Sequence, residues 1–183
     1  MALAPAPRHS YEMRALALFP IAALLLAGCG PRSDPALEAA CADRAPPTVL
    51  VGTGTDHFEP ITDAGVAVQE GPQGGYHIWI GLRCQNLGPH VDARYGVIDV
   101  ATGADLSLVG LRGALDLTYD ESVQADEISG LYGYLLDTPP GGDPPGPTDL
   151  LGREVELWAK VSDQCGKPAE SRVETVVTSY NRL

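Results

Sequence analysis

The stretch Gly71-Pro-Gln-Gly-Gly-Tyr-His-Ile-Trp-Ile-Gly-Leu-Arg-Cys84 decides the fold, because it places a turn directly before a strand. Its glycines and proline favour the turn, and strict alternation then puts four apolar side chains on one face. Those side chains are Ile78, Ile80, Leu82 and Cys84. β-Branched and aromatic residues fill the run, which disfavours a helix. We therefore expect a central core strand over Tyr76–Gln85.

From Thr48 onward the chain repeats this pattern of short apolar runs separated by turn signals. A length of 183 residues with 21 glycines and 16 prolines suits one domain with many turns. Thr138–Asp149 holds five prolines and three glycines and can only be a loop. We expect an all-β fold, an antiparallel β-sandwich in which each sheet buries one face. The expected strands are Val49–Thr53, Gly65–Gln69, Tyr76–Gln85, Arg94–Ala101, Leu106–Leu117, Ile128–Asp137, Arg153–Ser162 and Val173–Tyr180.

The C-terminal part carries a resemblance to a known fold. A Gly-Arg-x-Val-x-Leu strand, the turn Asp163-Gln-Cys-Gly166 and a final β-branched strand follow each other over Leu151–Val177. In this order they resemble an immunoglobulin or fibronectin type III module, which implies an immunoglobulin-like sandwich of about seven to eight strands. Gly71–His77 also resembles small exported bacterial proteins of unknown function that carry Gly-Pro-Gln-Gly-Gly-x-His before a core strand. That second resemblance implies a fold and no activity.

The N-terminus has the layout of an export signal. Ala15–Ala27 is a 13-residue apolar stretch, shorter than the ~20 residues that a spanning helix needs. Leu26-Ala27-Gly28-Cys29 follows it and resembles the lipobox of bacterial lipoproteins. The resemblance implies a signal peptide over residues 1–28, cleavage before Cys29 and lipidation of its thiol. Met13 is the expected start, with Met1 as the alternative.

The segment after the cysteine is expected to be a tether. Residues 29–47 are rich in proline, alanine and charge, and Asp34-Pro35 could cap a short helix through Arg44. Residues 48–183 would then form the exported β-sandwich domain. Gly30 stands where the lipoprotein resemblance would place an aspartate for inner-membrane retention, which favours the outer membrane. We expect an outer membrane lipoprotein, periplasmic or surface-exposed.

Charge excludes one class of function. The formal net charge is −12, and the acidic residues are spread along the chain instead of forming a block. Nucleic acid binding needs a stripe of lysine and arginine, and the sequence has none. The expected partners are the membrane, through the lipid anchor, and a protein of the cell envelope.

The cysteines predict a disulfide. If Cys29 is acylated, Cys41, Cys84 and Cys165 remain in an oxidising compartment, and three thiols cannot all pair within one chain. Cys84 and Cys165 each end an expected strand, so Cys84–Cys165 is the first choice. Cys41 with either partner is the rival, because sequence alone does not fix connectivity.

The search for chemistry predicts a protein that is not an enzyme. No Gly-x-Ser-x-Gly elbow is present, and we expect neither a cofactor nor a metal. His57, His77 and His90 lack the spacing of a metal-binding pair. The alternative is a metal-handling or enzymatic accessory protein of the periplasm, which would require these three histidines to converge.

One surface is expected to be functional. If the strand order is immunoglobulin-like, outward positions on three strands of one sheet lie side by side and expose a tryptophan beside tyrosine and aliphatic residues. This expected contact patch comprises Tyr95, Val97, Trp158, Lys160 and Val176. In the other interpretation, the Pro/Gly loop covers Trp158. The sequence thus predicts a lipid-anchored envelope protein that acts as a binding or structural module.

Overall fold

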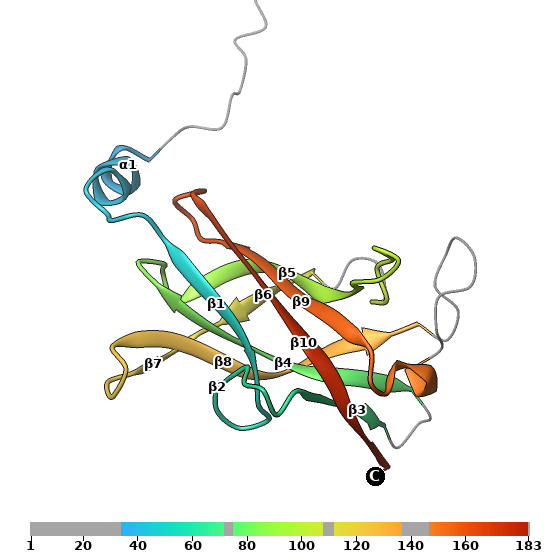
Figure 1. The fold of residues 1–183 in the computed structure, drawn as a ribbon. Coiled ribbons are helices and arrows are strands. Elements are labelled where there is room, and N and C mark those ends of the chain that lie inside the picture. The colour runs from blue at the N-terminus through green and yellow to red at the C-terminus, as the bar shows by residue number, and fades with distance from the viewer. Residues whose placement is uncertain (1–33, 72–74, 108–111, 137–146, 183) are drawn as a thin grey trace, which may run out of the picture. The chain divides into compact units, whose positions relative to one another are not determined.

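The computed structural model describes residues 34–71, 75–107, 112–136 and 147–182, which belong to one compact unit, Asp34–Leu183 (Figure 1). Strands dominate this unit, so the all-β prediction is confirmed. The elements are α1 (Pro35–Ala42), β1 (Thr48–Thr53), β2 (Glu59–Pro60), β3 (Val66–Glu70), β4 (Tyr76–Gln85), β5 (His90–Asp99), β6 (Arg112–Asp116), β7 (Thr118–Asp120), β8 (Ala125–Leu135), the 3-10 helix η1 (Pro147–Leu150), β9 (Glu154–Ser162) and β10 (Pro168–Arg182).

Strand β4 is the centre of the sheet, as its alternation predicts. One edge of β4 pairs with β3 near Tyr76 and with β1 near Cys84, and the other edge pairs with β8. Ile78, Ile80 and Leu82 are fully buried. The strand order is β2-β1-β4-β3-β10-β9-β5-β6, with β8 beside β4 and β7 beside β8.

Strand β10 joins the two halves of the sheet. Its first part pairs antiparallel with β9, and from Val177 onward it pairs in parallel with β3. A strand of 15 residues is long enough to leave one neighbour and continue beside another. The expectation of a purely antiparallel sandwich is therefore wrong at this pair, and the sheet is mixed.

A short segment after β5 curls the sheet back on itself. Asp105 bridges to Ile98 of β5, and Ser107 bridges to Leu135 of β8. The backbone N–H of Leu136 also donates to the carbonyl of Leu106, at 2.9 Å. Since β8 pairs with β4, the hydrogen-bonded path closes at this end around a core to which both halves of the sheet contribute.

The short helix predicted after Asp34 forms, and it ends at Ala42, two residues before the expected Arg44. α1 begins after Asp34, whose carboxylate accepts a hydrogen bond from the N–H of Ala36, with Pro35 at the first helical position. The turn between β9 and β10 also forms as expected: the N–H of Gly166 donates to the carbonyl of Asp163, and Gly166 has a φ of 70°.

Candidate functional site

A cluster of four aromatic rings lies on the outer face of β4 and β8. The alternation that buries Ile78 and Ile80 turns the two neighbouring rings of β4 outward, and the register sets one tyrosine of β8 opposite each of them. We call this cluster the aromatic patch. Its members are His77 opposite Tyr134 and Trp79 opposite Tyr132.

The rings of the aromatic patch are in mutual contact. Ring centroids are 4.5 Å apart for His77 and Trp79, 4.7 Å for His77 and Tyr132, and 4.6 Å for Trp79 and Tyr132. Tyr132 and Tyr134 stack with centroids 5.1 Å apart and planes within 10°. Such contacts hold ring orientations in place. The patch is therefore a preorganised surface built on two paired strands.

The two tyrosines remain open to solvent. Tyr132 is 43% exposed and Tyr134 is 42% exposed, whereas Trp79 is half-buried. Tyr180, elsewhere in the sheet, donates its hydroxyl hydrogen bond to Glu70. Among the described residues, the hydroxyls of Tyr132 and Tyr134 have no such partner. The patch thus offers ring faces together with free polar groups, the combination that is enriched at interfaces.

His77 is the buried member of the patch. Only 2% of it is exposed, and its Nε2 has no hydrogen-bond partner within the described part of the chain. Burial lowers the pKa of His77, so the imidazole is neutral at pH 7. Its ring meets Trp79 and Tyr132 edge-on and supports them from below. We interpret His77 as a positioning residue.

An acidic cleft lies further along the same face. It has a volume of about 530 Å³. The loop between β1 and β2 separates it from the aromatic patch, because the N–H of Gly130 in β8 donates to the carbonyl of Gly54. The ring of Phe58, in this loop, packs directly against Gly52 and Gly81. A Cβ added at Gly52 would lie 2.6 Å from that ring, and one added at Gly81 would lie 3.3 Å from it. The carboxylates that line the cleft belong to Asp56, Asp116, Asp120, Glu121 and Glu127.

The guanidinium of Arg83, on this face, contacts both an aromatic ring and a carboxylate that line the cleft. Arg83 on β4 places its Nε 2.5 Å from a carboxylate oxygen of Glu127. Its guanidinium also lies 4.4 Å from the ring centroid of Phe58. The guanidinium is thus held between an aromatic ring and a carboxylate.

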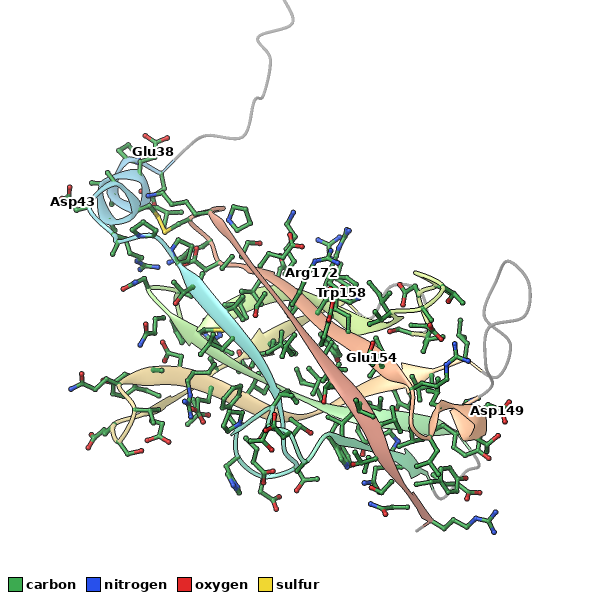
Figure 2. All side chains as sticks on the ribbon, viewed as in Figure 1. Glu38, Asp43, Asp149, Glu154, Trp158 and Arg172 are labelled. Carbon is green, nitrogen blue, oxygen red and sulfur yellow. A yellow bond between two sulfur atoms is a disulfide. The ribbon has the colours of Figure 1, made fainter. Side chains whose placement is uncertain are left out.

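The contact patch expected from the sequence forms only in part. Trp158, Lys160 and Val176 do lie on the outer face of β9 and β10, and Figure 2 labels Trp158 beside Arg172, its partner across the strands. The expectation is wrong for Tyr95 and Val97. The register sets Gly96 opposite Trp158, so these two residues point inward, and Val97 is fully buried.

Tyr95 instead lies close to the aromatic patch. It is half-buried and packs against the core. Burial raises the pKa of Tyr95, and the neighbouring hydroxyl of Tyr134 raises it further. The sequence signal for the aromatic patch is the pair of motifs His-x-Trp and Tyr-x-Tyr, whose meeting depends on the register between β4 and β8.

The disulfide joins Cys41 to Cys165, with Cα atoms 5.5 Å apart. The first choice, Cys84–Cys165, is therefore wrong, and the rival partner Cys41 forms the bond. Cys84 points from β4 into the core, where it is fully buried and unpaired, while Cys165 lies in the turn after β9. Burial raises the pKa of Cys84 to about 12, with a further contribution from Asp126, so this thiol is unreactive.

The Cys41–Cys165 disulfide and the Arg44–Asp163 ion pair hold α1 against the rest of the domain, and we call these two links the clasp. No residue of α1 is buried, so packing alone does not fix the helix. Asp163, whose side chain is 2% exposed, accepts from Arg44 at 2.5 Å and from the N–H groups of Gly88 and Cys165 at 2.9 Å and 2.8 Å. The clasp ties α1 and the residues that follow it to the turn between β9 and β10.

The three histidines of the alternative function do not converge. His57 pairs with Glu59 in the β1–β2 loop, His90 pairs with Asp116 at the start of β5, and His77 belongs to the aromatic patch. Across residues 34–71, 75–107, 112–136 and 147–182, no three His, Cys, Asp or Glu side chains are placed to hold a metal ion. The geometry gives the metal-handling alternative no support.

Comparison with protein families, with curated proteins and with solved structures finds no match to this chain. Cys29 and the rest of the expected signal lie outside the described residues. Within the part that the structure describes, no helix is long and apolar enough to cross a membrane.

Proposed function

We propose that this chain is a lipid-anchored protein of the cell envelope whose β domain is a binding module, and that the aromatic patch is its binding face. The observation that carries the proposal is the pair of stacked tyrosines, each more than two-fifths exposed, on a rigid strand pair. Aromatic side chains lose little conformational entropy on binding and dominate interface energetics. The proposed role is binding and not catalysis.

The proposed anchor is the acylated thiol of Cys29, with residues 1–28 removed. Its support is Leu26-Ala27-Gly28-Cys29 after a short apolar stretch. Each buried methylene of an acyl chain contributes about 0.8 kcal/mol, so several chains are needed for stable attachment. Gly30 in place of an aspartate supports the outer membrane as the location.

We further propose that the domain is a variant of the immunoglobulin-like sandwich. Strands β1, β4 and β8 form one layer, strands β5 and β9 form the other, and the long β10 contributes to both. The hairpin of β9 and β10, with its Asp-x-x-Gly turn, is the part that supports this arrangement.

Site-specific photocrosslinking in intact cells tests the binding face. Benzoylphenylalanine in place of Tyr134 should yield a discrete adduct with an envelope component, because that side chain would touch the partner. The matched control carries the same probe in place of Glu174, an exposed residue of β10 on the opposite outer face, and should yield none. Equal adducts from both positions, or none from Tyr134, would contradict the proposal.

Intact mass of the native protein tests the anchor separately. We expect a chain that begins at an acylated Cys29, and a Cys29→Ser variant that leaves the membrane fraction. An unmodified, soluble wild-type chain would exclude the anchor and would leave the proposal of the binding face unaffected.

A further inference from the structure

We propose that the aromatic patch and the acidic cleft together bind a basic, extended peptide segment of a partner protein, with arginine side chains over the rings and in the cleft. This inference rests on the proposed function and specifies the ligand of the same face.

The rings favour a cation. The face of an aromatic ring carries negative electrostatic potential, and a guanidinium stacks on it while keeping its hydrogen-bond donors free. Tyr132 and Tyr134 present such rings with open hydroxyls, which accept from a donor-rich side chain. Trp79 and the buried His77 hold them in position.

The cleft supplies charge complementarity. Of its five carboxylates, Glu127 is paired with Arg83 and Asp116 with His90. Within the described part of the chain, Asp56, Asp120 and Glu121 have no lysine or arginine partner. A net charge of −12 over the chain attracts basic ligands and repels polyanions, and the three carboxylates without such a partner favour this cleft as the place of binding.

The contacts of Arg83 show an arrangement that an arginine of the ligand could adopt. Its guanidinium lies between the ring of Phe58 and the carboxylate of Glu127, at the wall of the cleft itself. Incoming arginines could make the same two kinds of contact, one with the exposed rings of Tyr132 and Tyr134 and another with the carboxylate of Glu121 at the cleft.

The reach of β8 sets the length of the ligand. Glu127 lines the cleft and Tyr134 ends the patch, and both belong to β8, which runs beside β4 (Figure 1). They are seven positions apart on β8, but a bulge takes up one of these positions, so their partners on β4, Arg83 and His77, are six positions apart, or about 20 Å at ~3.3 Å per residue. An extended peptide of about seven to eight residues is long enough to cross the β1–β2 loop and span that distance, and Asp56 of this loop lines the cleft.

The test is a titration of the full chain, purified in detergent, with four probes. Three are the octapeptides (Gly-Arg)4, (Gly-Lys)4 and (Gly-Glu)4, and the fourth is the neutral glycan chitohexaose. We expect (Gly-Arg)4 to bind most tightly, (Gly-Lys)4 several-fold more weakly, and (Gly-Glu)4 not at all. Tight binding of chitohexaose with no binding of (Gly-Arg)4 would overturn the inference in favour of a glycan.

Matched variants locate the site. Tyr132→Ala/Tyr134→Ala should weaken (Gly-Arg)4 binding at least tenfold, whereas Tyr132→Phe/Tyr134→Phe, which keeps the ring faces, should retain most of it. Asp56→Asn/Glu121→Gln should weaken binding and flatten its salt dependence. Glu154→Gln/Glu174→Gln removes the same charge from the outer face of β9 and β10 and should leave the affinity unchanged.

Two results with the variants would also overturn the inference: equal losses from both charge-removing pairs, which would show nonspecific attraction, or no loss from the double alanine variant. Thermal unfolding of each variant excludes a folding defect as the cause. If (Gly-Arg)4 fails to bind while a crosslink from position 134 still forms in cells, the binding face stands and only the basic ligand is rejected.

Discussion

The two outer faces of the domain each carry one tryptophan, and their surroundings differ. On β9, Trp158 lies among charged neighbours, where Arg172 bonds to Glu156 at 2.7 Å and to Glu170 at 3.1 Å (Figure 2). On β4, Trp79 contacts other rings. The charges of the first face satisfy one another and remain solvated, whereas the rings of the second have exposed faces with no partner among the described residues. The neighbours across the strands, more than the tryptophan, decide which face can bind.

The largest effect on stability is expected from the clasp, which ends at the β9–β10 turn. Replacing both Cys41 and Cys165 by serine opens a bond between residues 124 positions apart and should lower the free energy of unfolding by about 2–5 kcal/mol. Denaturant unfolding with and without reductant measures this. Because the aromatic patch lies on β4 and β8, (Gly-Arg)4 affinity of the folded variant should not change. If the folded variant also lost affinity for (Gly-Arg)4, binding would depend on the clasp, and the two faces would not be independent.

The next effect concerns Trp158. Its indole covers Gly96, where an added Cβ would lie 2.9 Å from Nε1, so the tryptophan is partly a packing residue. Trp158→Ala should destabilise the domain by roughly 1–3 kcal/mol and leave binding intact. Chemical denaturation and a peptide titration on the same variant check both parts. If the variant were stable but bound the peptide more weakly, the binding face would have to lie on β9 and β10.

A smaller effect on stability is expected at the patch. Tyr132→Ala/Tyr134→Ala removes side chains that are already half in solvent, and should lower the free energy of unfolding by about 1 kcal/mol. The same variant should lose binding. Thermal and denaturant unfolding give the first quantity, and a loss of several kcal/mol would show that the tyrosines serve the fold more than the surface.

The smallest effect is a pH dependence from His77. Burial lowers the pKa of its imidazole from the ordinary value of 6.5, so the unfolded chain binds the proton more readily than the folded one. The stability that this provides is present above pH 6.5 and declines as the pH falls through 6.5 toward the lowered pKa. Unfolding curves between pH 8 and pH 5 should therefore show a steeper decline for the wild type than for His77→Phe. Identical pH profiles would show that His77 is not held neutral beneath the rings.

Local pattern was enough to place most strands. The alternation in Tyr76–Gln85 predicts β4 with the bounds that the structure has, and the turn at Asp163–Gly166 and the cap at Asp34 were also readable. These features depend on neighbours in sequence, for which period and turn chemistry are sufficient.

Contacts between segments that are distant in sequence could not be predicted from local pattern. The parallel contact of β3 with β10, the inward face of Tyr95 and Val97, and the choice of Cys41 over Cys84 each depend on which distant segment lies alongside. A shift of one residue in register exchanges the two faces of a strand, which is the error made for β5. The aromatic patch was missed for the same reason, since His77 and Tyr134 are 57 positions apart and meet only through the β4–β8 register.

Hydroxyl-radical footprinting of the protein in envelope fractions and in purified form tests the difference between the two faces most directly. We expect oxidation of Tyr132 and Tyr134 to fall several-fold in the envelope, where a partner covers them, while oxidation of Trp158 stays the same. Unchanged oxidation of the two tyrosines, or protection of Trp158 instead, would contradict the account.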